Sequence, residues 1–97
     1  MNEVELELVG KFREIFNRKN MRIPVEPGTS LLNLLGELSR TIETDLHSHF
    51  IGPNGKPMEE ASLIIVNGKV VDLSRISEYR VNPGDKVVLS PSVAGGG

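Results

Sequence analysis

Apolar and acidic residues alternate strictly over residues 4–8, where valine and leucines occupy one set of positions and Glu5 and Glu7 the other. A period of two predicts a strand with one buried face and one exposed face. Val9 falls on the glutamate face, so we expect an apolar side chain that points outward. Gly10 then ends or bends the strand.

Between residues 11 and 25 the pattern predicts a short helical turn and a second strand. Phe12 and Phe16 have helical spacing, which is typical of aromatic side chains that pack beneath a sheet. Residues 21–25 alternate again, and Pro24 favours an edge strand or a strand end because proline has no N–H to donate.

The longest periodic segment predicts the main helix. Pro27-Gly28 indicates a turn, and Thr29 or Ser30 can cap the helix that follows. The apolar positions then recur with the 3.6-residue period at Leu31, Leu34, Leu35, Leu38 and Ile42. Residues 45–60 carry mixed signals, which we interpret as a helical turn followed by a loop.

The second half of the chain reads as strands joined by turns. Residues 63–66 predict a buried strand, and Asn67-Gly68 is the favoured two-residue turn into a return strand that begins at Val70. Residues 74–81 look irregular, and residues 86–90 predict a last strand.

This order of elements predicts an α+β fold with a mixed sheet of about five strands and one main helix packed on one face. It matches the β-grasp, or ubiquitin-like, architecture. We expect one domain over residues 1–91 and a flexible glycine-rich tail over residues 92–97.

Composition removes several classes of function. The 13 acidic and 11 basic residues are interspersed and give a formal net charge of −2, so no basic surface for nucleic acid is expected. The sequence has no cysteine, which excludes disulfides, thiolate metal sites and a cysteine nucleophile. No apolar run approaches a membrane span, and the acidic start is unlike a targeting peptide. We expect a cytoplasmic protein that is monomeric when alone.

The sequence contains no combination of residues that matches a known type of catalytic or metal site. His47 and His49 are close in sequence, but a metal site needs three or four converging ligands, so we predict no metal. The serines lack a Gly-x-Ser-x-Gly motif. Asn54-Gly55-Lys56 and Asn67-Gly68-Lys69 lack phosphate-loop spacing and are interpreted as turns.

The C-terminus is the remaining candidate for chemistry. The chain ends in Val93, Ala94, Gly95, Gly96 and Gly97. Five extended residues span roughly 17 Å, at about 3.3–3.6 Å each, which is enough to enter a pocket of another protein. A carboxylate is ionised at neutral pH and is a poor electrophile, so it must be activated before a nucleophile can attack it. Glycine suits this role because it places no Cβ beside the reacting carbonyl.

Several motifs resemble the MoaD/ThiS family of ubiquitin-like sulfur carriers, and most closely its MoaD branch, the small subunit of molybdopterin synthase. The motifs are residues 10–15 after the first strand, the Pro-Gly-Thr entry to the helix, Val66-Asn67-Gly68, residues 82–87 and the closing residues 91–96. The last of these is similar to the family pattern Pro-Pro-Val-x-Gly-Gly.

The resemblance implies a mechanism and partners. A MoeB- or ThiF-like enzyme would use ATP to adenylate the terminal glycine, and a sulfur donor would convert it to a thiocarboxylate. The tail would then deliver sulfur to the catalytic large subunit, MoaE. The chain itself would bind no cofactor and would not be an enzyme alone. The family pattern ends at Gly96 and leaves Gly97 over. We expect Gly97 to be the reactive end, because it carries the terminal carboxylate of the given chain, or Gly96 if Gly97 is removed first.

The resemblance also implies an apolar docking patch on the sheet that includes Val9 and Val70, with Ser90 where the family often has an aromatic residue. Three alternatives stay open from the sequence. The chain could be a thiamine-type sulfur carrier, a ubiquitin-like modifier joined to lysines, or a β-grasp binding module with an inert tail.

Overall fold

A computed structural model describes residues 2–92 of the chain, so the predicted tail residues from Val93 onward lie outside the described part. The strands are β1 (Glu3–Leu8), β2 (Asn20–Pro24), β3 (Thr29–Ser30), β4 (Ser62–Val66), β5 (Lys69–Val70), β6 (Arg80–Val81) and β7 (Lys86–Pro91). The helices are α1 (Lys11–Phe16), α2 (Leu31–Ile42) and the 3₁₀ helices η1 (His47–His49) and η2 (Leu73–Glu78).

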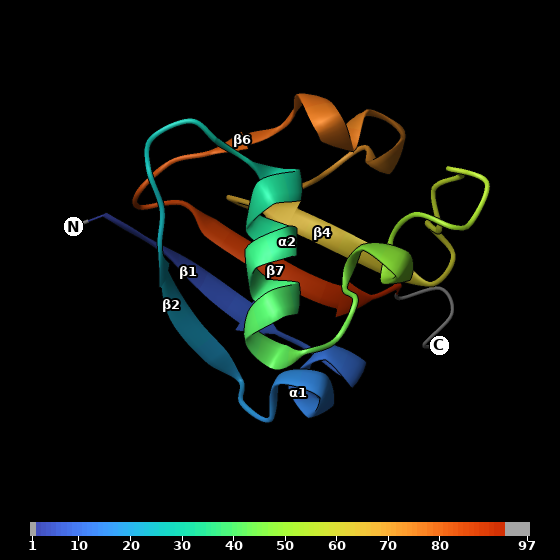
Figure 1. Cartoon of the computed structure of the whole chain (residues 1–97), viewed down its shortest axis with the longest axis horizontal. Coiled ribbons are helices and arrows are strands. Elements are labelled where there is room, and N and C mark those ends of the chain that lie inside the picture. The colour runs from blue at the N-terminus through green and yellow to red at the C-terminus, as the bar shows by residue number, and fades with distance from the viewer. Residues whose placement is uncertain (1, 93–97) are drawn as a thin grey trace.

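The main sheet has five strands in the order β2-β1-β7-β4-β5. β1 and β7 run parallel at its centre, and the other neighbours are antiparallel. The helix α2 crosses one face of this sheet, and α1 lies at the end where β1 finishes (Figure 1). The predicted β-grasp fold, with a mixed sheet and one main helix, is therefore confirmed.

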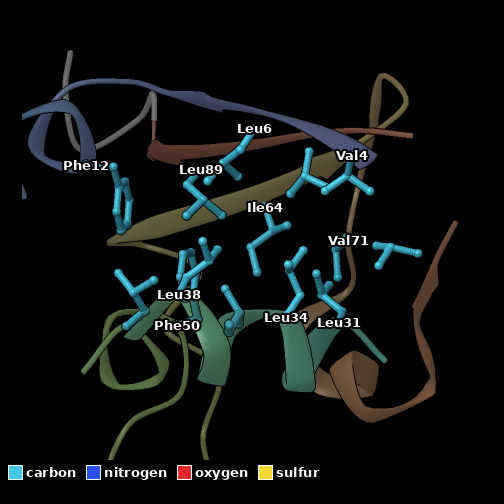
Figure 2. Packing of buried hydrophobic residues seen from close by; sticks show 14 of the residues in the cluster. Val4, Leu6, Phe12, Leu31, Leu34, Leu38, Phe50, Ile64, Val71 and Leu89 are labelled. Atoms are coloured by element: carbon cyan, nitrogen blue, oxygen red, sulfur yellow. The ribbon is translucent and has the colours of Figure 1, made fainter. Parts of the chain in front are cut away.

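The core lies between the sheet and α2. Side chains from the strands point toward side chains of the helix, with Phe12 and Phe50 filling the space at one end (Figure 2). The fully buried members include Val4, Leu6, Leu8, Leu89 and Ile64 from the strands and Leu31, Leu35 and Leu38 from α2. Burial of each such side chain contributes about 1.5–3 kcal/mol, so the alternation in β1 and the helical period in α2 explain this packing.

The boundaries of α2 follow local chemistry. Ser30 is the N-cap, and its side-chain oxygen accepts a hydrogen bond from the N–H of Asn33 (3.0 Å). The helix ends at Ile42, and the C-cap residue Glu43 adopts a left-handed conformation with φ of 55°. Of the two residues predicted as the N-cap, Thr29 and Ser30, the structure confirms Ser30.

The predicted hairpin turn after β4 is also confirmed. Asn67 and Gly68 both have positive φ, 52° and 84°, as the two-residue hairpin turn requires. The Asn67 side chain donates to Asp85 (3.0 Å) and accepts from the N–H of Lys86 (2.9 Å). One residue therefore closes the hairpin and connects it to the start of β7.

Residues 74–81 are more ordered than their sequence indicates. They contain most of η2, which is kinked at Arg75, and the short strand β6, which pairs with β3 in a second, two-stranded sheet. Two-residue strands are too short to produce a periodic pattern, so the prediction of an irregular segment was wrong here. Among residues 2–92, no helix combines the length and apolar character that a membrane crossing needs.

Candidate functional site

β7 lies at the centre of the sheet between β1 and β4 and leads the chain toward its C-terminus. Just after it, Ser92 is 8% exposed, and its N–H donates to the carbonyl oxygen of Ala61 (3.1 Å). The packed part of the chain thus extends one residue beyond the predicted boundary at residue 91. Residues 93–97, including the predicted reactive Gly97, follow directly from this anchored position.

Gly10 packs against the end of β7. It has φ of 58° and ψ of −124°, a conformation that residues with a side chain rarely adopt. A Cβ atom at this position would lie 2.8 Å from Cγ of Pro91, which is too close for any real contact. The glycine therefore serves both the turn into α1 and the close approach of Pro91.

The ammonium group of Lys11 lies beside Ala61, to which Ser92 also donates a hydrogen bond. Nζ of Lys11 donates to the carbonyl oxygen of Ala61 (3.4 Å), the acceptor that also binds Ser92, and it lies 5.3 Å from the ring centroid of Phe12. Phe12 in turn stacks on Phe50, with a centroid distance of 5.4 Å and an angle of 4° between the rings. Lys11 therefore connects the carbonyl group that pairs with Ser92 to the aromatic side chains of the core.

Ser62 lies opposite Pro91 in the pairing of β4 with β7. Its side-chain oxygen is fully buried and has no hydrogen-bond partner among the described residues. An unpaired buried hydroxyl costs free energy. At the point where β7 leaves the core, the hydroxyl of Ser62 therefore lacks a favourable hydrogen bond among the described residues.

The outer face of the sheet, opposite α2, carries an apolar patch beside this exit. Register places Val88 beside Ile65 and Ile65 beside Val70, while Leu63 faces Ser90. Val9 continues β1 next to this row, because its N–H donates to the carbonyl of Leu89 (3.0 Å). We define the outer-face patch by its apolar residues, which are Val9, Leu63, Ile65, Val70 and Val88.

The structure therefore brings the three predicted docking residues onto one face. Val70 is 60% exposed, whereas Val9 and Ser90 are half-buried. The hydroxyl of Ser90 donates to the carbonyl of Pro91 (2.9 Å), so this side chain contacts the backbone that leads to the tail.

Sequence reasoning missed the middle of the patch. It treated residues 63–66 as one buried strand, whereas Leu63 and Ile65 point to the outer face and are only half-buried. The signal was present, because a strand with a polar outer face would alternate and β4 does not. An unbroken apolar run at a sheet with only one covered face indicates an exposed apolar surface.

Charged residues next to the patch are paired rather than of one sign. Glu7 and Lys86 form an ion pair on the outer face, with 3.0 Å between the carboxylate oxygen and Nζ, and this hydrogen bond and charge raise the pKa of Lys86. Glu5 lies opposite Arg22 and beside Lys86 in the strand register. The acidic residues of β1 are thus interleaved with cations and do not form a uniform acidic surface.

The two histidines do not form a metal site with their neighbours. Within residues 2–92, no three His, Cys, Asp or Glu side chains converge on a point. The ring of His49 packs edge-on against Phe12 at 5.5 Å. Partial burial and the nearby charge of Lys11 lower the pKa of His49, with a smaller opposing effect of Asp45, so this side chain belongs to the packing around α1.

A protein-family model named ThiS family matches residues 6–96 of the chain, nearly its whole length. The chain belongs to the ThiS family. The match includes Gly95 and Gly96 and stops one residue before Gly97, as the predicted tail motif does. Together with the fold, this membership places the chain among the ubiquitin-like sulfur carriers and modifiers.

Several solved structures share the fold of this chain. The Haloferax volcanii small archaeal modifier protein 1 has a TM-score of 0.70 at 20% identity, with 95% of this chain and 99% of that chain covered. A putative molybdopterin converting factor, subunit 1, from Pyrococcus furiosus has a TM-score of 0.69 at 22% identity, with coverages of 95% and 99%.

The small archaeal modifier protein 1 of Methanosarcina acetivorans has a TM-score of 0.69 at 18% identity, with coverages of 98% and 97%. At these identities the likeness concerns the fold. No curated protein sequence matches this chain significantly.

Proposed function

We propose that this chain is the sulfur-carrying small subunit of a molybdopterin synthase, with the carboxylate of Gly97 as the group that carries sulfur. The observation that supports this best is the extent of the family match, which runs from β1 to Gly96 and so includes the glycine tail. The fold shared with a molybdopterin converting factor subunit over nearly both full lengths agrees with it.

The chemistry takes place on the terminal carboxyl group. A carboxylate oxygen of Gly97 attacks the α-phosphate of ATP held by a MoeB- or ThiF-like enzyme, which forms an acyl adenylate and releases pyrophosphate. A sulfur nucleophile at the sulfide level then attacks the acyl carbon and displaces AMP, which leaves a thiocarboxylate. In a MoaE-like large subunit, the thiocarboxylate sulfur attacks a carbon of the substrate and displaces an oxygen leaving group, which gives a thioester between carrier and substrate. Water then hydrolyses this thioester, so that the sulfur stays on the substrate as a thiol and the carboxylate of the carrier is regenerated.

This division of labour fits the described residues. The chain supplies the carrier group, and the activating enzyme supplies ATP and the catalytic side chains, so no cofactor is needed on this chain. The outer-face patch would dock on both partners, because an exposed apolar surface beside the point where β7 ends can bury itself while the tail enters the partner's site.

The decisive experiment measures intact mass. The full chain is incubated with a MoeB- or ThiF-like activating enzyme, ATP and a sulfide donor. Replacement of one oxygen by sulfur in the C-terminal fragment supports the proposal. An unchanged mass, with an enzyme that activates another ThiS-family carrier in parallel, would show that the tail is inert.

Deletion of Gly97 identifies the reactive end. If Gly97 carries the sulfur, the chain that ends at Gly96 should be activated much more slowly, because its carboxylate reaches one residue less far into the activating site. Equal activation of both chains would assign the role to Gly96.

A substitution on the patch tests docking separately from chemistry. Val70→Asp should raise the KM for activation about ten-fold with little change in kcat, because burial of a valine side chain is worth about 1.5 kcal/mol and the charge adds a desolvation cost. Val70 is exposed, so the fold should not change. Asn33→Asp, an exposed position on α2, is the matched control and should leave KM unaltered.

Two other functions would use the same activated C-terminus, and the molecule that accepts the carrier or its sulfur distinguishes them. The shared fold with two small archaeal modifier proteins supports a modifier as second candidate. Conjugates on lysines of other proteins, found by mass spectrometry in an extract supplied with ATP, would favour it. Sulfur transfer to a thiazole precursor rather than to a molybdopterin precursor would favour a thiamine-type carrier.

A further inference from the structure

The strand β2 has an open edge. It is the first strand of the sheet, so within residues 2–92 only its β1 side is paired. The N–H of Val25 donates to the carbonyl of Asn2 (2.7 Å), which, with the antiparallel register, directs the odd-numbered residues of this strand toward β1. The backbone N–H and C=O groups of Asn20 and Arg22 therefore point away from the sheet.

This open edge is short and solvent-exposed. Asn20, Arg22 and Pro24 are all exposed. Pro24 can accept a hydrogen bond but cannot donate one, so pairing on this edge ends there. The edge thus suits a short extended peptide and disfavours extended edge-to-edge aggregation.

A hollow of about 290 Å³ lies between the β2 end of the sheet and α2. Ile23, Val25 and Leu34 supply its apolar lining, and the carboxylates of Glu26 and Glu37 also line it. No cation contributes to this lining. A strand added beside β2 would direct every second side chain to the α2 side of the sheet, where this hollow lies.

We propose that the open edge of β2 and this hollow bind an extended peptide of another protein, in which β-branched apolar residues alternate with lysine or arginine. Backbone pairing with Asn20 and Arg22 supplies affinity, as in other strand additions. Because side chains alternate between the two faces of a strand, the basic side chains of the peptide point to the α2 side and enter the hollow. Their methylene stems pack against Ile23, Val25 and Leu34, and their charged ends lie near Glu26 and Glu37. The apolar residues between them point to the other face of the sheet.

A second copy of this chain fits the edge less well. Antiparallel pairing of two β2 strands about their midpoint places Arg22 of one copy near Arg22 of the other, and like charges opposite each other are destabilising. β2 and β5 also form the two opposite edges of the sheet, and β5 carries Val70. Peptide binding therefore leaves the outer-face patch available, and the proposal does not depend on the sulfur-carrier function.

The test is an NMR titration of the full chain with the synthetic peptide Lys-Val-Lys-Ile-Lys-Val, and with Glu-Val-Glu-Ile-Glu-Val as the charge-reversed probe. The basic peptide should shift the amide signals of residues 20–26 and 34–37 and slow hydrogen exchange at Asn20 and Arg22. Shifts confined to the outer-face patch, or equal binding of the acidic peptide, would overturn the proposal. So would the same shifts produced by raising the protein concentration alone, which would indicate self-association.

Two variant pairs sharpen the result. Glu26→Lys with Glu37→Lys should weaken binding of the basic peptide about ten-fold, because each exposed charge pair is worth a factor of roughly two to five. Glu59→Lys with Glu60→Lys changes the charge equally in the loop before β4 and should leave binding unaltered. Equal weakening by both pairs would show only a general effect of charge and would refute the site.

A further pair of variants tests the backbone hydrogen bonds between β2 and the peptide. Arg22→Pro removes the outward N–H and should abolish binding, whereas Arg22→Ala keeps it and should reduce affinity less than three-fold. Thermal unfolding verifies that each variant is folded. If Arg22→Pro unfolds the chain, the hydrogen-exchange result at Asn20 and Arg22 in the unaltered protein decides, and absence of slowing there refutes strand addition.

Discussion

Replacement of Gly10 by alanine tests whether close packing at the base of the tail holds β7 in place. The added Cβ would lie 2.8 Å from Cγ and 3.1 Å from Cδ of Pro91. Proline is a rigid ring, so neither atom can rotate away from the contact. Relief therefore requires movement of the turn before α1 or of the end of β7.

The cost has two parts that can be estimated separately. A non-glycine residue in this backbone conformation costs about 1–3 kcal/mol. Overpacking against a rigid neighbour adds about 1–3 kcal/mol. We expect Gly10→Ala to lower the free energy of unfolding by about 2–6 kcal/mol, the sum of the two parts, which corresponds to a fall in Tm of roughly 8–48 °C at about 4–8 °C per kcal/mol for a domain of this size.

Urea denaturation followed by circular dichroism measures this loss, with Gly28→Ala as the matched control. Gly28 also has positive φ, 77°, but a Cβ there would meet nothing within 4 Å. Gly28→Ala should therefore show a backbone cost without a steric clash, and a larger loss for Gly10→Ala supports the contact with Pro91. Equal losses for the two variants would refute the argument that Gly10 is required by this packing.

Four further changes test other parts of the structure. Gly36→Ala should raise stability by about 0.5–1 kcal/mol, because a Cβ there meets nothing within 4 Å inside α2, and a loss would contradict this open environment. Ser62→Ala should change stability by less than about 1 kcal/mol in thermal unfolding, because the buried hydroxyl has no partner to lose, and a larger loss would reveal a hidden hydrogen bond. Phe12→Ala should cost about 3–5 kcal/mol in urea denaturation, and a cost near zero would contradict its burial. Because the pKa of His49 lies below its ordinary 6.5 in the folded protein, the unfolded chain binds more protons, so stability should fall as pH decreases through 6.5 toward the folded pKa; His49→Gln should reduce this fall, as measured by Tm between pH 8 and 5, and an unchanged fall would contradict the assignment to His49.

Elements with a strong local signal were predictable from the sequence. The alternation in β1, the helical period with a serine cap in α2 and the Asn67-Gly68 turn each occur where the pattern indicated. In each case the residues that determine the conformation are neighbours in the chain. Local physics therefore sufficed, and the β-grasp order of elements followed from it.

Pairing between distant segments was less accessible. β3 and β6 have only two residues each, and they pair with each other although α2, β4, β5 and η2 lie between them in the chain. Similarly, nothing in residues 63–66 shows which face α2 covers. Only the completed sheet shows that Leu63 and Ile65 lie on the uncovered side.

The sequence by itself determined the longer elements, their order and the glycine-rich end, because these depend on periodicity, turn chemistry and residue type. The tertiary structure decided which residues surround the start of the tail. Gly10, Lys11 and Ala61 lie near the end of β7 because parallel pairing with β1 and antiparallel pairing with β4 place three distant segments at the same end of the central strands. Such contacts depend on strand register across the whole sheet, which no local pattern encodes.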